Sequence, residues 1–119
     1  MHLFVPKEHD SRETRTALTP DGAAQLIKLG AEVTVEAGLG EKSGFPDALY
    51  ENAGARLTSD RNAALQAASA VLQVCKPSVA DVALMKEGTL LICLLEPFTS
   101  FDVLDALEKQ KVNAVSLEM

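Results

Sequence analysis

Short apolar segments alternate along the chain with segments whose apolar residues have helical spacing. The first apolar segment, residues 3–5, is followed by a proline and a charged loop, and a helical pattern then begins at Thr19 and Pro20 and ends at Gly30. Threonine is a good N-cap, proline suits the first helical position, and glycine readily adopts the left-handed stop. The apolar positions of this predicted helix are Ala23, Leu26, Ile27 and Leu29.

The same strand-and-helix unit recurs to the end of the chain. Further strands are predicted at residues 32–36, 55–57, 71–74, 89–95 and 112–117. Helices are predicted from Pro46-Asp47, from Ser59-Asp60 to about Ala68, from Ser78 through Lys86 to a stop at Gly88, and from Thr99 or Ser100 onward. The alternation predicts an α/β domain, with a doubly wound, mainly parallel sheet of about six strands and helices on both faces, flavodoxin-like or Rossmann-like.

One predicted strand, residues 89–95, is almost continuously apolar. Such a run is typical of a central parallel strand that is covered on both faces. The final predicted strand has no covering helix after it. We therefore expect residues 1–119 to be a single α/β domain that is part of a longer protein.

Composition excludes several classes of protein. The net charge of −6 and the pI near 4.8 argue against binding to nucleic acid or to anionic membranes, which requires a basic surface. No apolar run approaches the roughly 20 residues of a membrane span. The two cysteines, Cys75 and Cys93, form no disulfide framework, which favours a soluble protein in a reducing compartment.

Three charged residues follow predicted strands and become candidates for a site. They are Arg15, in the loop after the first strand, and Lys76 and Glu96, at the ends of later strands. Because the carboxyl ends of parallel strands meet at one edge of a sheet, we expect all three at the same edge. Arg15 could clamp a carboxylate with two hydrogen bonds, or it could pair with a neighbouring acid such as Glu8 or Glu13.

Other kinds of catalytic site have less support. A lysine beside Cys75 could lower the pKa of that thiol, although a small buried residue next to a solvated lysine is the simpler interpretation. Cys93 is expected in the core. No paired cysteines or helical pair of histidines suggest a metal site, and no Ser-His-Asp set can be assembled.

A glycine-rich loop follows the second predicted strand. Its spacing is Gly38-x-Gly40-x-x-x-Gly44, one residue longer than the dinucleotide-binding fingerprint. Pro46 moves the start of the next helix past the position that a pyrophosphate would need. The loop is therefore interpreted as a tight strand-to-helix turn, and this segment alone is not expected to bind NAD.

Several motifs occur together in one order along the chain. They are Pro6-Lys7-Glu8, Glu13-Thr14-Arg15-Thr16-Ala17-Leu18-Thr19-Pro20, Leu29 through Gly40, Gly44-Phe45-x-Asp47-x-x-Tyr50-x-x-Ala53-Gly54-Ala55, Val74-x-x-Pro77, the Gly88 turn with its apolar strand, and Ala114 through Glu118. With these motifs the chain resembles the alanine dehydrogenase / nicotinamide nucleotide transhydrogenase α-subunit family over essentially its whole length.

The resemblance implies an oxidoreductase with two α/β domains and an NAD(H) cleft between them. This chain resembles the first half of the N-terminal domain, so NAD(H) would be bound mainly by a second domain that is absent here. The family's alanine dehydrogenases carry an arginine, a lysine and a histidine at the cleft. Arg15 matches the arginine, whereas Cys75 and Glu96 stand at the other two positions, with Lys76 one residue away.

These departures favour the transhydrogenase branch. The resemblance then implies hydride transfer from NADH to NADP⁺, coupled to proton translocation. It also implies a homodimer, a β subunit that holds NADP(H), and a membrane subunit that anchors an otherwise cytoplasmic assembly to the inner membrane. The alternatives are an alanine dehydrogenase and a chain that is not catalytic, either a module that only mediates subunit contacts or a truncated remnant. The isolated 119-residue chain is expected to be inactive.

Overall fold

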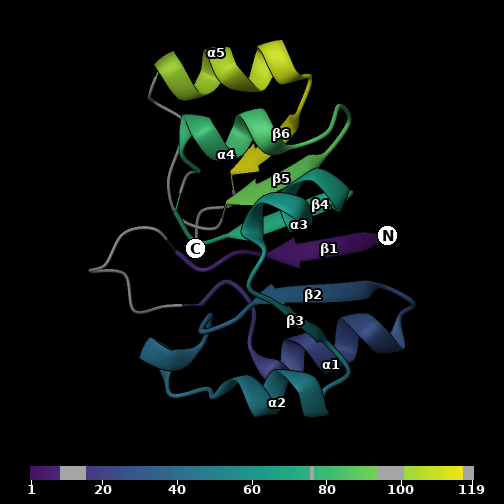
Figure 1. The fold of residues 1–119 in the computed structure, drawn as a ribbon. Coiled ribbons are helices and arrows are strands. Elements are labelled where there is room, and N and C mark those ends of the chain that lie inside the picture. The colour runs from purple at the N-terminus through teal and green to yellow at the C-terminus, as the bar shows by residue number, and fades with distance from the viewer. Residues whose placement is uncertain (9–15, 76, 94–100, 117–119) are drawn as a thin grey trace.

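Six short strands form one sheet. They are β1 (His2–Val5), β2 (Glu32–Glu36), β3 (Arg56–Thr58), β4 (Ala70–Gln73), β5 (Leu90–Cys93) and β6 (Asn113–Ser116). The computed structural model describes residues 1–8, 16–75, 77–93 and 101–116. The strand order is β3-β2-β1-β4-β5-β6 and every pairing is parallel (Figure 1). This order is that of the Rossmann fold, so the predicted α/β class is confirmed and the flavodoxin-like order is not the one found.

The helices cover both faces of this sheet. They are α1 (Pro20–Lys28), α2 (Asp47–Asn52), α3 (Arg61–Ala67), α4 (Val79–Leu84) and α5 (Phe101–Gln110), with a short 3₁₀ helix η1 (Glu41–Ser43) before α2. Figure 1 shows α1 and α2 beside β2 and β3, and α4 and α5 toward β5 and β6. Successive residues of β1 point to opposite faces of the sheet. Leu3 and Val5 pack with residues of α1 and α2, and Phe4 packs with residues of α3, α4 and α5.

Three of the predicted helix starts are correct because each has a side-chain cap. Thr19 Oγ1 accepts the Gly22 N–H at 3.1 Å, and Asp60 Oδ1 accepts the Ala63 N–H at 3.1 Å. Ser78 Oγ caps α4 in the same way. Each cap satisfies one of the N–H groups that a helix start leaves without an internal partner.

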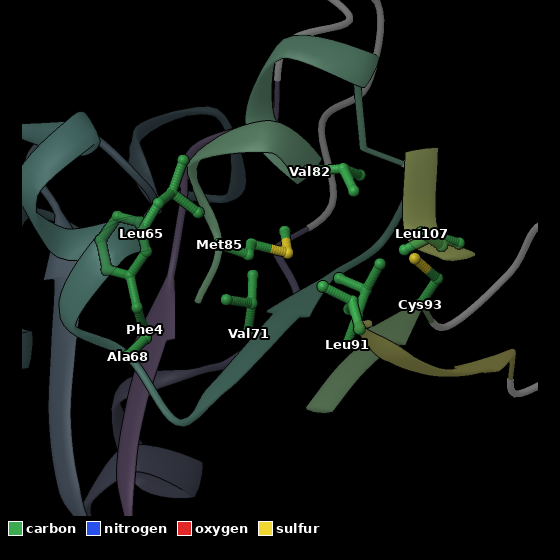
Figure 2. Close-up of a cluster of buried hydrophobic side chains, with 10 residues drawn as sticks. Phe4, Leu65, Ala68, Val71, Val82, Met85, Leu91, Cys93 and Leu107 are labelled. Carbon is green, nitrogen blue, oxygen red and sulfur yellow. The ribbon is translucent and has the colours of Figure 1, made fainter. Parts of the chain in front are cut away.

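One core cluster joins α3, α4 and α5 to the sheet. Figure 2 shows strand residues such as Val71 and Leu91 close to helix residues such as Val82 and Leu107. The buried members of this core cluster are Phe4, Leu65, Ala68, Val71, Val82, Met85, Leu91, Cys93, Leu107 and Val112. The predicted core position of Cys93 is therefore confirmed, with none of its surface exposed.

Some sequence predictions of the packing are wrong. The helix predicted to run through Lys86 ends at Leu84, because Met85 takes an extended backbone conformation and its side chain is inserted in the core. Leu29 is the C-cap of α1 and is 84% exposed, so it contributes nothing to the buried face.

The strand predicted to be covered on both faces is fully covered on one. Leu91 and Cys93 of β5 are buried, whereas Leu90 and Ile92, on the other face, are only partly buried. The reason is that α1 and α2 lie against the β2–β3 half of that face. Residues 94 and 95 of the predicted strand lie outside the described residues.

Candidate functional site

The order of the strands reverses direction between β1 and β4. These strands are neighbours although they are far apart in sequence, with Leu3 paired to Ala70. Open α/β sheets bind their ligands outside the carboxyl ends of the strands at such a reversal. We call residues 6–8 and 73–75, which stand at the carboxyl ends of β1 and β4, the switch-point edge.

The Glu8 carboxylate ties the two sides of the switch-point edge together. Its Oε2 accepts the Val74 N–H at 3.0 Å, and its Oε1 accepts the Cys75 N–H at 2.9 Å. Hydrogen bonds to an ionised carboxylate are about twice as strong as neutral ones. The start of the β1–α1 connection is therefore held against the end of β4 by a charged group.

Arg61, the first residue of α3, lies at the centre of a network of charged groups beside this edge. Its Nη1 donates to Glu36 Oε1 at 2.7 Å, and its guanidinium forms an ion pair with Asp81 of α4. Nη1 also donates to the Lys7 carbonyl at 3.0 Å. The three charged side chains are only 12–22% exposed, so the network is well shielded from water.

The electrostatics of the network keep Arg61 charged. Burial by itself lowers the pKa of the guanidinium, but the hydrogen bonds and negative charges of Asp81 and Glu36 outweigh it, so the pKa of Arg61 is raised. Protonation of this group therefore does not change in any physiological range of pH. Arg61 therefore carries a permanent positive charge in the folded protein.

Sequence reasoning did not find Arg61, although one signal was present. A cation in the first turn of a helix opposes the helix dipole, whose positive end lies there. Arg61 directly follows the N-cap Asp60, so its position predicts a compensating set of acids. Its partners Glu36 and Asp81 are 25 and 20 residues away in sequence, which is why no local pattern identifies them.

The residues proposed from sequence are not placed by the structure. Arg15, Lys76 and Glu96 all lie outside the described residues. The strands that precede them, β1, β4 and β5, are adjacent and parallel, as the prediction of a shared edge requires. Cys75 is half-buried, and its amide is bound by Glu8.

One polar side chain at the switch-point edge is buried without a hydrogen bond. Gln73, the last residue of β4, has no exposed surface, and within the described residues neither its Oε1 nor its Nε2 has a partner. A buried amide that lacks partners costs about 1–3 kcal/mol. Gln73 is polar in the otherwise apolar predicted strand of residues 71–74, but the strand pattern did not show that its amide would lack a partner.

The glycine loop is closed by its own contacts. The Gly38 N–H donates to Asp47 Oδ1 at 2.9 Å, and the Phe45 N–H donates to the Gly40 carbonyl at 2.8 Å. A Cβ added at Gly40 would lie 2.8 Å from the Tyr50 hydroxyl oxygen. Contacts within the protein thus hold the loop in a turn between β2 and α2.

A hollow of about 420 Å³ lies between α1 and α2, away from the charged network. It is lined by Thr19, Pro20, Asp21, Ala24, Phe45, Leu49, Asn52 and Ala53. Its lining is mainly apolar and offers only Asp21 as an ionisable group. Among the described residues, charged groups therefore gather at the switch-point edge and not in this hollow.

Two kinds of feature are absent from the described residues. No group of three or more histidine, cysteine, aspartate or glutamate side chains there could hold a metal ion. The longest described helix, α5, has 10 residues and is too short to cross a membrane.

Fold and site together define a Rossmann-like α/β domain with charged groups gathered at its topological switch point. The sequence of residues 4–119 matches the family model described as alanine dehydrogenase/PNT, N-terminal domain. Since this match takes in nearly the whole chain, the protein belongs to that family. The resemblance predicted from the sequence motifs is confirmed.

The family includes two kinds of relative that are about equally similar to this chain. It is 37% identical over 124 aligned residues to an NAD(P) transhydrogenase alpha subunit of Rhodospirillum rubrum, covering 100% of this chain and 32% of the relative. It is 36% identical over 118 residues to the alanine dehydrogenase of Bacillus subtilis, covering 99% of this chain and 31% of the relative.

A solved structure of a transhydrogenase is also similar to this chain. The crystal structure of transhydrogenase from Sinorhizobium meliloti superimposes with a TM-score of 0.89 at 30% identity, covering 98% of this chain and 33% of that one. The chain thus spans about a third of the length of the proteins that it matches.

Proposed function

We propose that this chain is the N-terminal segment of the NAD(H)-binding α subunit of a proton-translocating NAD(P) transhydrogenase, an oxidoreductase that passes hydride from NADH to NADP⁺. The observation that carries the proposal is the similarity to a transhydrogenase alpha subunit along 100% of the chain. It is supported by Cys75, which stands where the alanine dehydrogenases of this family carry a lysine.

In this proposal residues 1–119 are a single domain belonging to the N-terminal domain of a longer two-domain protein. The glycine loop departs from the dinucleotide fingerprint, its Gly38 N–H is bonded to Asp47, and the space beside Gly40 is filled by Phe45 and Tyr50. NAD(H) is therefore assigned mainly to a second domain, with this chain forming one wall of the cleft. Calorimetry should detect NADH binding by the intact protein and none by the 119-residue chain.

The wall of the cleft is assigned to the switch-point edge and to the segments that leave it. Arg15 is proposed to face the nicotinamide end of the cleft, with Lys76 and Glu96 following the neighbouring strands. The partners in this scheme are a second copy of the subunit, a β subunit that binds NADP(H), and a membrane subunit. The domain itself is then cytoplasmic and peripheral to the inner membrane.

A second candidate function is an alanine dehydrogenase. It is favoured by the 36% identity to the Bacillus subtilis enzyme and by Arg15, which matches the arginine of that branch. Against it stand Cys75 and Glu96, where the branch has a lysine and a histidine that orient the substrate and move a proton.

One pair of assays on the intact protein, assembled with its β and membrane subunits, separates these functions. We expect NADPH formation from NADH and NADP⁺, and no oxidation of NADH that depends on pyruvate and ammonium. The opposite result would establish the alanine dehydrogenase, and inactivity in both assays would leave a module that is not catalytic.

Arg15→Ala should lower the hydride-transfer rate or the NADH affinity about tenfold, the loss expected for a charge-assisted contact. Arg56→Ala, an exposed position on β3, is the matched control.

A further inference from the structure

Lys7, the residue before Glu8, is held by hydrogen bonds on both sides of its backbone. Its N–H donates to Glu36 Oε1 at 2.8 Å, and its carbonyl accepts from Arg61 Nη1 at 3.0 Å. Glu36 Oε1 also accepts from Arg61 Nη1 at 2.7 Å, so the two side chains and the Lys7 backbone form one closed set of contacts. The peptide groups that flank Lys7 are therefore fixed by residues from β2 and α3.

Glu8 projects from this fixed point onto the end of β4. Its two carboxylate oxygens accept the N–H groups of Val74 and Cys75 at 3.0 and 2.9 Å. A carboxylate that must meet two successive amides tolerates little displacement of its own backbone. The position of the Glu8 side chain thus depends on the contacts made at Lys7.

Arg61 is the member of the set that reaches furthest through the fold. It binds the Lys7 carbonyl 54 residues away, Glu36 25 residues away and Asp81 20 residues away. A planar guanidinium carries five N–H donors in a fixed fork, which suits it to acceptors on different elements. By contrast, the pair of Lys109 with Asp105 is made within α5, and its side chains are 77% and 61% exposed.

We propose that Arg61 is a positioning residue, which fixes the Lys7 backbone together with Glu36, holds the Glu8 carboxylate on the amides of Val74 and Cys75, and so sets the shape of the switch-point edge where the cleft ligand binds. The inference rests on the proposed function for the identity of that ligand. The chain of contacts from Arg61 to Val74 and Cys75 does not depend on it.

Amide hydrogen exchange of the whole 119-residue chain tests the chain of contacts directly. In Arg61→Met, exchange at Val74 and Cys75 should be about tenfold faster relative to the Leu90 amide, the change expected for one lost charge-assisted hydrogen bond. Leu90 is the reference because its N–H donates to the Ser69 carbonyl at the opposite edge of the sheet. A residue that only adds stability would accelerate all three amides equally, and that result would overturn the proposal.

Three further variants sharpen the measurement. Glu36→Gln keeps an acceptor for the Lys7 N–H but loses the charge that faces Arg61, so it should give a smaller acceleration at Val74 and Cys75 even if Arg61→Met folds poorly. Arg61→Lys keeps the charge and loses the planar fork, so fast exchange at the two amides should persist. Lys109→Met removes an exposed ion pair and should change neither amide; an equal acceleration there would contradict the assignment to Arg61.

A kinetic measurement on the intact protein links the network to the cleft. Arg61→Met should lower the rate of hydride transfer at saturating NADH by about tenfold, because the displaced edge misplaces the reacting groups. Faster local exchange with an unchanged rate would refute the link between the network and the cleft. If the unmodified intact protein transfers no hydride when it is assembled with its β and membrane subunits, the proposed function fails, while the exchange data still decide the function of Arg61.

Discussion

The same two strands, β1 and β4, are joined at both ends, and the two joints are chemically different. At their amino ends the His2 N–H donates to Ser69 Oγ at 2.8 Å, and the Ser69 N–H donates to the His2 carbonyl at 2.9 Å. At their carboxyl ends the Glu8 carboxylate binds two backbone amides and is backed by Arg61. The amino-end joint is made by a hydroxyl and backbone groups, and the other by full charges.

This difference separates what the sheet needs for folding from what it needs for function. Hydrogen bonds between neutral groups are sufficient to align two parallel strands, as the amino ends show. Bringing several charges together in a shielded place costs desolvation energy that folding alone does not require. The carboxyl ends also contain Gln73, whose amide is buried without a partner among the described residues. Costs of this kind accumulate at functional sites.

The largest effect on stability is expected from filling the space inside the glycine loop, which follows the carboxyl end of β2. A Cβ at Gly40 would lie 2.7 Å from Phe45 Cβ and 2.8 Å from the Phe45 carbonyl oxygen. Gly40→Ala should therefore lower the free energy of unfolding by about 3 kcal/mol in urea denaturation, the upper range for overpacking.

Gly44 of the same loop provides the matched control. Its φ is +83°, and a Cβ there would meet nothing within 4 Å. Gly44→Ala should cost only about 1 kcal/mol, from the left-handed backbone conformation. Equal losses for both variants would show that backbone strain and not packing closes the loop.

The next largest effect on stability is expected at the joint between the amino ends of β1 and β4. Ser69→Ala removes the acceptor of the His2 N–H and should destabilise the protein by about 2 kcal/mol, because that donor stays partly buried. Relative to the Ala37 amide, whose N–H donates to the Thr58 carbonyl away from Ser69, exchange at Val74 and Cys75 should not change. A selective effect on those amides would mean that the two edges are coupled and the comparison is wrong. Ser59→Ala, at an exposed position, controls for the loss of a serine hydroxyl.

Replacing Gln73 tests whether its buried amide at the switch-point edge destabilises the protein. Gln73→Met keeps the shape of the side chain and removes an amide that lacks hydrogen-bond partners in the described structure, so the protein should become more stable by about 1 kcal/mol. Gln110→Met is the matched control, because Gln110 Nε2 donates to the Met85 carbonyl at 2.7 Å and its loss should destabilise. A destabilised Gln73→Met would show that the amide is bonded after all.

The sequence predicted the local features of the fold better than the contacts between distant elements. Helix starts at Thr19 and Ser78 depend on a residue and its neighbours within three positions, and the structure confirms them. The strand order and the contacts of Arg61 depend on residues brought together from distant regions of the chain. Such pairings leave no periodic pattern, so Arg15 could be proposed from sequence while the Arg61 network could not.

The smallest effect is expected from the titration of Tyr50, which lies against the glycine loop. Its hydroxyl donates to the Leu18 carbonyl at 2.8 Å. Burial raises the pKa of this phenol, the charge of Asp47 raises it further, and a hydrogen bond with Thr16 partly offsets both. The neutral phenol is thus favoured in the folded state, and the corresponding stability is fully present below the unfolded pKa of about 10 and is lost as the pH rises through the folded pKa.

Tyr50→Phe removes this titration together with one hydrogen bond. At pH 7 the variant should be less stable by about 1 kcal/mol. As the pH rises above about 10, the unmodified protein should lose stability faster than the variant, so that the difference between them shrinks. Urea denaturation of both proteins between pH 8 and pH 11 measures this difference directly, since the lysines titrate alike in both. A difference that grows with pH would mean that the folded protein stabilises the phenolate and lowers the pKa of Tyr50, which would contradict the raised pKa described here.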